Sequence, residues 1–149
     1  MKKDLDTNMT LKIKKLHPEA TMPKYLRPGD AAMDLYSNEY KIIQPNQREL
    51  ISTGIAMAIP QGNVGLIWDR SGMAANYGIK SMGGVIDSNY RGEIKVILHN
   101  LTAQPFVVEK GMRMAQMLIQ KIEQKEILEV QELDDSIRGE KGFGSTGLK

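Results

Sequence analysis

Short apolar segments separated by turn-forming residues run through this chain, and no other feature limits its fold more. In residues 53–59 and 64–68, for example, apolar side chains alternate with small or polar ones, and Pro60-Gln61-Gly62 lies between the two segments. Further strands are expected at residues 11–13, 33–35, 41–43, 48–51, 85–86, 94–98 and 114–122. Short strands at this spacing indicate an all-β sandwich of the jelly-roll or β-clip kind.

One short helix is expected within this β-rich pattern, at residues 71–76. Ser71 is a candidate N-cap for it. Gly78 lies just past its end, where a left-handed residue often terminates a helix.

Two of the expected strands are apolar on both faces. In residues 114–122, Met117 and Leu118 fall on opposite faces, and in residues 94–98 Ile97 lies opposite the other apolar side chains. An antiparallel sheet in a monomer usually leaves one face in water. A partner subunit is the expected cover for the second face, so we expect a homo-oligomer.

Composition excludes several classes of function. The 149 residues suffice for one domain with a core, and a net charge of +2 is too small and too dispersed to bind nucleic acid. The absence of cysteine excludes disulfides, thiolate metal sites and a cysteine nucleophile. Residues 51–68 are uncharged, but Pro60 and several glycines interrupt them, so no membrane span is expected. With no signal peptide at the start, we expect a cytoplasmic protein whose residues 1–9 form a loose arm.

The stretch GVIDSNYRGEI, residues 84–94, reads as a β-hairpin with a polar tip. In the tip, Asp87 could orient a water, Tyr90 could pack on a sugar or base, and backbone amides could read a base edge. Gly92 can take the positive φ that such a turn often needs. The alternative is that Asp87 and Asn89 serve only the turn and that Tyr90 only packs.

Polar residues that simple packing does not require occur at three further places. Asp34 interrupts an apolar strand, and Gln116 interrupts the strand MRMAQMLIQ, where a solvent-facing position is the alternative. Arg70-Ser71-Gly72 offers a cation, a hydroxyl and exposed amides at a helix start, which suits an anion. A plain N-cap is the alternative role for Ser71.

The tail, residues 138–147, contains a literal G-x-G-x-x-G at Gly142 to Gly147. A dinucleotide-binding motif should open a helix, but only two residues follow it here. A flexible arm fits better, with Arg138 supplying charge and Phe143 stacking on a base. Its amides and the hydroxyls of Ser145 and Thr146 would wrap phosphates, whereas the alternative is a disordered tail.

Five segments of this chain resemble the five ordered motifs of the trimeric dUTP diphosphatases (dUTPases). These segments are PGDAAMDLYS, DRSGMA, GVIDSNYRGEI, GMRMAQ and RGEKGFGSTG. They follow the family's order and usual spacing, and the resemblance covers the chain from about Leu11 to Gly147. It implies a single dUTPase domain over residues 1–149.

The resemblance implies a jelly-roll homotrimer with swapped C-terminal tails and three sites at subunit interfaces. Each site would hydrolyse dUTP to dUMP and diphosphate by in-line water attack on the α-phosphorus. This reaction keeps uracil out of DNA and supplies dUMP for dTMP synthesis. One subunit would contribute Asp34, the Arg70-Ser71-Gly72 turn and Gln116, a second would contribute the hairpin, and a third the tail.

The resemblance also implies residue roles. Asp87 would orient the attacking water, Tyr90 would exclude a 2′-hydroxyl, and Mg²⁺ would bind the phosphates with Asp34 held to it through water. Residues 134–149 would form a mobile C-terminal lid. The implied substrate contacts are Arg70, Ser71, Gly72, Gly84, Val85, Ile86, Tyr90, Gln116, Arg138, Phe143, Gly144, Ser145 and Thr146.

Four positions depart from the family pattern, and none of them removes a group with a named chemical role. They are Ala32, Asp69, Asn89 and Lys141. Asp69 replaces a common proline and places a negative charge near the phosphates, which can weaken triphosphate affinity.

Two other functions compete with this one. The dCTP deaminases share the fold, but laying their hairpin on Asp87 and Gly92 puts Ile97 where a proton-shuttling glutamate belongs. A non-catalytic nucleotide-binding regulator is the second alternative, and retention of Asp87 together with the tail argues against it. A zinc hydrolase is excluded because His17 and His99 are isolated.

Overall fold

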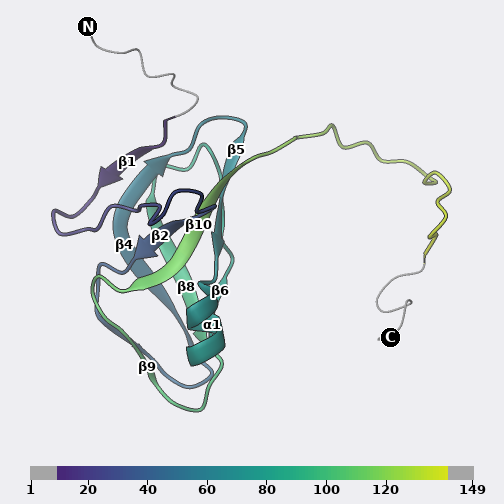
Figure 1. The fold of residues 1–149 in the computed structure, drawn as a ribbon. Helices are drawn as coiled ribbons and strands as arrows, with labels where there is room; N and C mark the ends of the chain where they lie inside the picture. The colour runs from purple at the N-terminus through teal and green to yellow at the C-terminus, as the bar shows by residue number, and fades with distance from the viewer. Residues whose placement is uncertain (1–9, 141–149) are drawn as a thin grey trace, which may run out of the picture.

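The computed structural model describes residues 10–140, and ten strands and one helix form within them (Figure 1). The elements in chain order are β1 (Lys12–Lys15), β2 (Met33–Tyr36), β3 (Lys41–Ile43), β4 (Arg48–Ala58), β5 (Asn63–Trp68), α1 (Ser71–Tyr77), β6 (Ile79–Met82), β7 (Val85–Ile86), β8 (Glu93–Asn100), β9 (Phe106–Val108) and β10 (Arg113–Lys121). The all-β sandwich with one short helix is confirmed.

Two four-stranded sheets share one apolar core. The first has the order β1-β4-β8-β6 and the second the order β2-β10-β5-β7, while β3 and β9 form a small third sheet. Every strand pairing is antiparallel. Ile51 and Val96 of the first sheet are buried with Leu35 and Met117 of the second. This shared burial fixes how the loops at the ends of the strands lie relative to one another.

β4 is one eleven-residue strand rather than two short ones. The register with β8 shifts between Ser52 and Ala56, and Gly54 lies inside this irregularity with a φ of +69°. A Cβ on Gly54 would lie 2.9 Å from the Cβ of Ala20, so glycine is required there. The carboxylate of Glu93 accepts a hydrogen bond from the Gly54 N–H at 2.8 Å. This bond gives a partner to a backbone amide that the irregular β4–β8 pairing does not satisfy.

The N-cap of the helix is Arg70, one residue before the predicted N-cap Ser71. Arg70 has φ −82° and ψ 127°, and no side chain caps the helix. Ser71 is the first helical residue, so its predicted capping role is wrong and its hydroxyl is left for other partners. Gly78 ends the helix in the left-handed conformation, as predicted, with φ +61°.

The strands on either side of the tip at residues 87–92 do not pair with each other. β7 pairs with β5 in the second sheet, whereas β8 pairs with β4 and β6 in the first. The predicted hairpin is therefore a connection between the two sheets, closed at its tip by a hydrogen bond from the Tyr90 N–H to the Asp87 carbonyl. Gly92 does not take a positive φ. A Cβ there would lie 2.3 Å from the Tyr90 hydroxyl, so any other residue would displace the Tyr90 ring.

Both large sheets carry apolar side chains on their outer faces. On the first sheet, the exposed Leu50 pairs with Ile97. On the second sheet, Trp68 is 55% exposed and lies near Leu66 and Leu118. The prediction that some strands are apolar on both faces is thus confirmed for β8 and β10.

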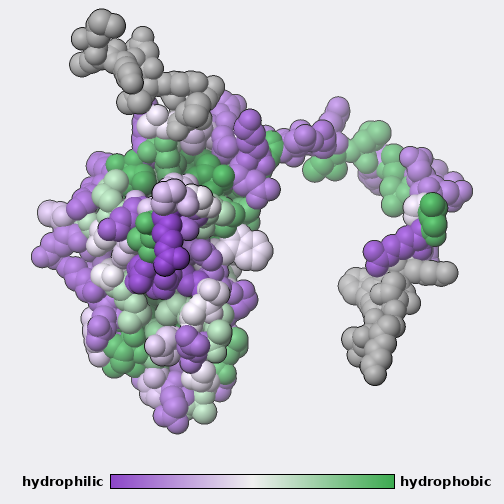
Figure 2. Space-filling model, viewed as in Figure 1, coloured by the Kyte–Doolittle hydropathy of each residue, from purple (hydrophilic) through white to green (hydrophobic). Residues whose placement is uncertain are grey.

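The chain leaves the sheets after β10 as an extended segment, residues 122–140 (Figure 1). Apolar residues stand along this segment between polar ones (Figure 2). Ile127 and Leu133 are 97% and 88% exposed. Such exposure is unusual for large apolar side chains in a monomer.

No helix within residues 10–140 is long and apolar enough to cross a membrane.

Candidate active site

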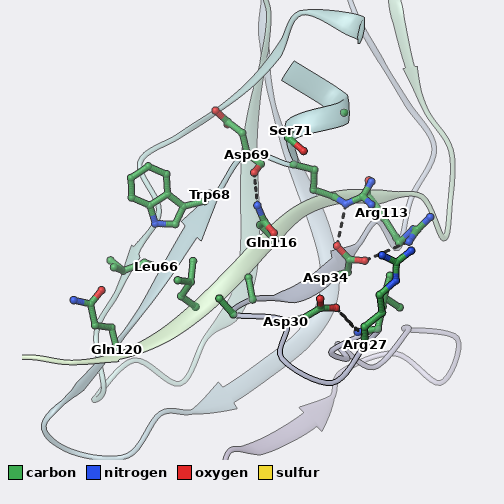
Figure 3. A pocket seen from close by; sticks show the side chains of 16 residues that line it. Arg27, Asp30, Asp34, Leu66, Trp68, Asp69, Ser71, Arg113, Gln116 and Gln120 are labelled. Carbon is green, nitrogen blue, oxygen red and sulfur yellow. Dashed lines mark hydrogen bonds and ion pairs between the residues drawn. The ribbon is translucent and has the colours of Figure 1, made fainter. Parts of the chain in front are cut away.

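A cleft of about 820 Å³ opens beside the start of α1 (Figure 3). Its wall comes from β2, from the end of β5 with the turn into α1, from β10 and from the loop before β2. It gathers the residues of all three places that the sequence marked as polar exceptions. These are Asp34, Ser71 and Gly72 with Arg70, and Gln116.

Asp34 lies between two arginines at the base of this cleft. Asp34 is only 7% exposed, and its Oδ1 accepts a hydrogen bond from Arg70 Nε at 2.9 Å. Its Oδ2 lies 3.5 Å from Arg113 Nη1. Arg70 Nη1 also donates to the Arg113 carbonyl at 3.3 Å. Burial and the Asp34 charge together raise the pKa of the neighbouring Tyr36.

The turn that follows β5 presents Ser71 and Gly72 at the cleft, where both are exposed. A Cβ on Gly72 would meet nothing within 4 Å, so this stretch of backbone faces open space. Gln116 approaches the turn from β10 and donates from Nε2 to the Asp69 carbonyl at 2.7 Å. Gln116 is therefore tied to the turn and is not simply a solvent-facing residue.

Three charged residues of the cleft were missed by sequence reasoning. Arg113 closes the pair around Asp34, and Arg27 and Asp30 line the cleft from the loop before β2. Asp30 holds this loop, because its Oδ2 accepts from the amides of Leu26 and Arg27 at 3.1 and 2.9 Å. Alternation along the strand gave no signal for Arg113, because residues three apart point to opposite faces of a regular strand, and the register of β10 with β2 shifts between Arg113 and Ala115.

The tip residues line a different hollow. Val85, Ile86, Asp87 and Tyr90 line a shallow pocket of about 320 Å³, and none of them lines the cleft. Within one chain, the structure therefore brings the predicted phosphate-binding residues together but leaves the predicted base- and water-binding residues elsewhere.

The tip itself is held by local contacts. The Tyr90 hydroxyl donates to the Glu93 carbonyl at 3.0 Å, and Arg91 Nη1 donates to the carbonyls of Ser88 and Tyr90 at 2.6 and 2.8 Å. Burial opposes ionisation of Glu93. The hydrogen bonds from Ser52 and Gly54, with the charge of Lys95, outweigh it and lower the pKa of this carboxyl.

Gly84 immediately precedes β7 and joins it to β5 through a backbone hydrogen bond. Its carbonyl accepts from the Ile67 N–H at 2.8 Å, and its φ is +103°. A Cβ would lie 2.7 Å from the Ile67 carbonyl oxygen, so only glycine permits this approach. β7 follows as the last strand of its sheet. One of its edges is not covered by any strand among residues 10–140, and backbone groups there can pair with a ligand.

Of the tail residues predicted to contact the substrate, only Arg138 lies within the described part of the chain. Arg138 belongs to the extended segment that leads away from the sheets (Figure 1). Phe143, Gly144, Ser145 and Thr146 lie outside the described residues.

Within residues 10–140, no group of three or more His, Cys, Asp and Glu side chains could hold a metal ion. Guanidinium groups, a hydroxyl, an amide and free backbone together suit phosphate oxygens. The cleft of this all-β fold is therefore chemically suited to a polyphosphate.

The family model for dUTPase matches residues 18–147, and the chain belongs to this family. A deoxyuridine 5′-triphosphate nucleotidohydrolase from Corynebacterium glutamicum is 47% identical over 140 residues, covering 92% of this chain and 94% of that protein. The enzyme of the same name from Clostridium kluyveri is 48% identical over 141 residues, covering 93% and 99%.

Solved structures give the same family. A dUTPase of Staphylococcus bacteriophage 80alpha, solved with dUpNHpp, is similar with a TM-score of 0.89 and 30% identity, covering 94% of this chain and 99% of that one. A dUTPase of phage phi11 of S. aureus, described with a structural Mg(II) ion, has a TM-score of 0.79 and 25% identity, covering 85% and 99%.

Proposed function

We propose that this chain hydrolyses dUTP to dUMP and diphosphate, with the cleft binding the phosphates. The observation that carries the proposal is the Asp34 carboxylate held between Arg70 and Arg113, beside Ser71 and Gln116. Membership of the dUTPase family supports the same reaction.

Phosphoryl transfer requires positioning and neutralisation of charge more than covalent chemistry. Asp34 and the Arg113 carbonyl already hold the Arg70 guanidinium, so little conformational freedom is lost when phosphate binds. Ser71 and the backbone at Gly72 add donors from the turn, and Gln116 adds an amide from β10. Together these groups would fix the α-phosphorus for attack.

Asp87 is the proposed water-orienting carboxylate. It is exposed at the tip and lines the shallow pocket with Tyr90. A carboxylate there can accept a hydrogen from a water and aim its oxygen at the α-phosphorus. The water would be the nucleophile, and diphosphate would leave from the opposite side.

Tyr90 and β7 are the proposed selectors of deoxyribose and uracil. The Tyr90 ring is fixed through its hydroxyl by the Glu93 carbonyl, and the ring would pack under the deoxyribose and leave no room for a 2′-hydroxyl. The open edge of β7, with Val85 and Ile86, would pair with the uracil edge, and Gly84 would place this edge.

The proposed assembly is a homotrimer in which the cleft and the tip come from different subunits. Separate hollows for the two groups, apolar outer faces on both sheets and the exposed segment after β10 support it. A second subunit that supplies the tip and a third that supplies the tail would complete each site. This arrangement would also cover Trp68, Ile127 and Leu133.

Mg²⁺ is the proposed cofactor, and Asp34 is the residue that would hold it through water. Both Asp34 oxygens face arginines, which suits an outer role better than direct ligation. When bound to the phosphates, Mg²⁺ neutralises their charge.

The remaining proposals concern the ends of the chain and its place in the cell. Residues 1–149 would form one domain, and residues 134–149 would act as a lid, with Phe143 over uracil and Arg138 toward the terminal phosphate. An ordered lid would exclude bulk water from the reaction. We place the reaction in the cytoplasm.

The test is diphosphate release from dUTP with Mg²⁺, run beside UTP, dCTP and dTTP. Release from dUTP alone supports the reaction, the base reading and the exclusion of the 2′-hydroxyl. Binding of dUTP with no turnover would instead favour a non-catalytic nucleotide-binding protein.

A further inference from the structure

Asp69 lies at the junction of three strands beside the cleft. It follows the last residue of β5 and directly precedes Arg70. Its Oδ1 accepts hydrogen bonds from the Ser81 N–H at 2.5 Å and from the Ser81 hydroxyl at 2.6 Å. Its Oδ2 accepts from Lys80 Nζ at 2.6 Å. The carboxylate is therefore fully engaged by two neighbouring residues of β6.

These bonds join the two sheets. β5 and β10 belong to the second sheet, whereas β6 belongs to the first. Asp69 thus ties the end of β5 to β6 at the point where the chain turns into α1. The proline that is common here in the family would restrict the backbone directly, whereas Asp69 restricts it through bonds to a neighbouring strand.

The negative charge of Asp69 is balanced by a neighbouring lysine. Its side chain is 20% exposed, and Lys80 forms an ion pair with it. Burial opposes ionisation, but the hydrogen bonds from Lys80 and Ser81 outweigh it and lower the pKa of the Asp69 carboxyl. A paired carboxylate that turns toward β6 is not arranged to repel phosphates.

The backbone of Asp69 contacts the phosphate-binding groups on two sides. Its carbonyl accepts the Gln116 amide at 2.7 Å (Figure 3). Its peptide bond leads into Arg70, whose guanidinium Asp34 holds at 2.9 Å. A shift of the Asp69 backbone would therefore displace the Gln116 side chain and the Arg70-Ser71-Gly72 turn together.

We propose that Asp69 is a positioning residue for dUTP hydrolysis, and that its bonds to Lys80 and Ser81 hold the turn and Gln116 in the geometry that binds phosphates. This inference rests on the proposed function, since it names a residue acting on the same site. Its test is distinct, because the wild-type rate decides the proposed function and only the variants decide the role of Asp69.

The first comparison is between Asp69→Ala and Asp69→Asn in the full chain. The alanine removes both carboxylate oxygens, so kcat/KM for dUTP should fall about tenfold or more, because small displacements of positioned groups are costly. Asparagine keeps an oxygen for the Ser81 N–H and hydroxyl, and should recover most of that loss. Glu39→Ala is the matched control, since the Glu39 carboxylate accepts from the Ser52 amide at 2.6 Å outside the cleft. It should leave KM and kcat unchanged.

The second comparison is a double-mutant cycle with Gln116. If Asp69 acts by placing Gln116, the loss caused by Gln116→Ala should be smaller in the Asp69→Ala background than in the wild type. Losses that simply multiply would overturn this route. Should Asp69→Ala fail to fold, Lys80→Met and Ser81→Ala each remove one bond, and each should raise KM by about two- to threefold.

Two results would overturn the proposal itself. If Asp69→Ala lowers the melting temperature but keeps the wild-type kcat and KM, the carboxylate serves stability alone. If both Asp69 variants bind dUTP more tightly than the wild type, Asp69 repels the phosphates, and its bonds to β6 do not position the site.

Discussion

The cleft and the tip differ in how complete they are within one chain. In the cleft, Asp34 is 7% exposed and both of its oxygens meet arginines of the same chain. At the tip, Val85 is 68% and Tyr90 44% exposed. The proposed phosphate-binding half is already ordered within one chain, whereas the proposed base- and water-binding half presents its groups outward.

This difference separates two physical tasks. Phosphates carry high charge, and recognising them requires fixed cations and donors, which burial inside one fold can supply. Selecting a base and aiming a water requires an enclosed, dry space, which a shallow pocket on one chain does not provide. A second subunit closing over the cleft would meet that need.

The largest predicted effect separates the two halves by kinetics. Asp87→Asn should reduce kcat by about 100-fold or more while leaving dUTP binding nearly intact, because only the orientation of the water is lost. Arg70→Ala is the contrasting variant and should raise KM as well. Stopped-flow turnover with equilibrium dUTP binding measures both. Substantial residual turnover in Asp87→Asn would mean that another group orients the water.

The second effect concerns the tail. A chain ending at Ile137 keeps both sheets and the cleft but lacks Arg138 and everything after it. We expect the same melting temperature and oligomeric state, with kcat/KM lowered by about tenfold or more, since a group that orders over the substrate is gone. Calorimetry and light scattering supply the controls. An unchanged rate would show that the tail is no lid.

A third effect tests the tip through one glycine. In Gly92→Ala the new Cβ would lie 2.3 Å from the Tyr90 hydroxyl, so the ring must move. The preference for dUTP over UTP should then fall by about tenfold, while stability changes little because the ring is largely exposed. Tyr90→Phe is the comparison variant, since it keeps the ring but loses the hydroxyl bond to the Glu93 carbonyl, and it should lower the preference less than Gly92→Ala does. If Gly92→Ala discriminates like the wild type, another group excludes the 2′-hydroxyl.

The smallest effect is on stability in acid. The lowered pKa of Glu93 means that its contribution is fully present above its ordinary value of 4.5 and is lost as pH falls through the lower folded value. The unfolded chain binds the proton first, which favours unfolding. The melting temperatures of wild type and Glu93→Gln should therefore differ at neutral pH and converge as the pH falls below 4.5 and through the lower folded value. A constant difference would mean that the carboxylate charge plays no part.

Local patterns predicted most of the elements, though not β6 and β9, because period-2 alternation and turn residues act over a few residues. The helix end at Gly78 and the strands around Asp34 and Gln116 follow from such patterns. The pairing of β7 with β5 could not be predicted, because a strand–turn–strand pattern shows only that the chain reverses. Which edge each strand joins depends on the shared core of both sheets.

The candidate site also has residues that local sequence patterns predicted and contacts that depend on how the sheets pack. The sequence placed Asp34 among the candidate residues because it breaks an apolar pattern, and Arg70 because it offers a cation at the start of a helix. It could not reveal that Arg113, far along the chain from Asp34, would pair with the same carboxylate. Nor could it show that Asp69 turns toward Lys80, since that contact depends on how the two sheets pack.

The most direct test of the central claim mixes two inactive variants, Arg70→Ala and Asp87→Asn. The first has a defective cleft with an intact tip, and the second has the reverse. If each site joins the cleft of one subunit to the tip of another, random mixed trimers should regain about a quarter of the wild-type activity. A mixture that forms mixed trimers, as shown by copurification of differently tagged subunits, yet stays as inactive as its parents would place the whole site within one chain.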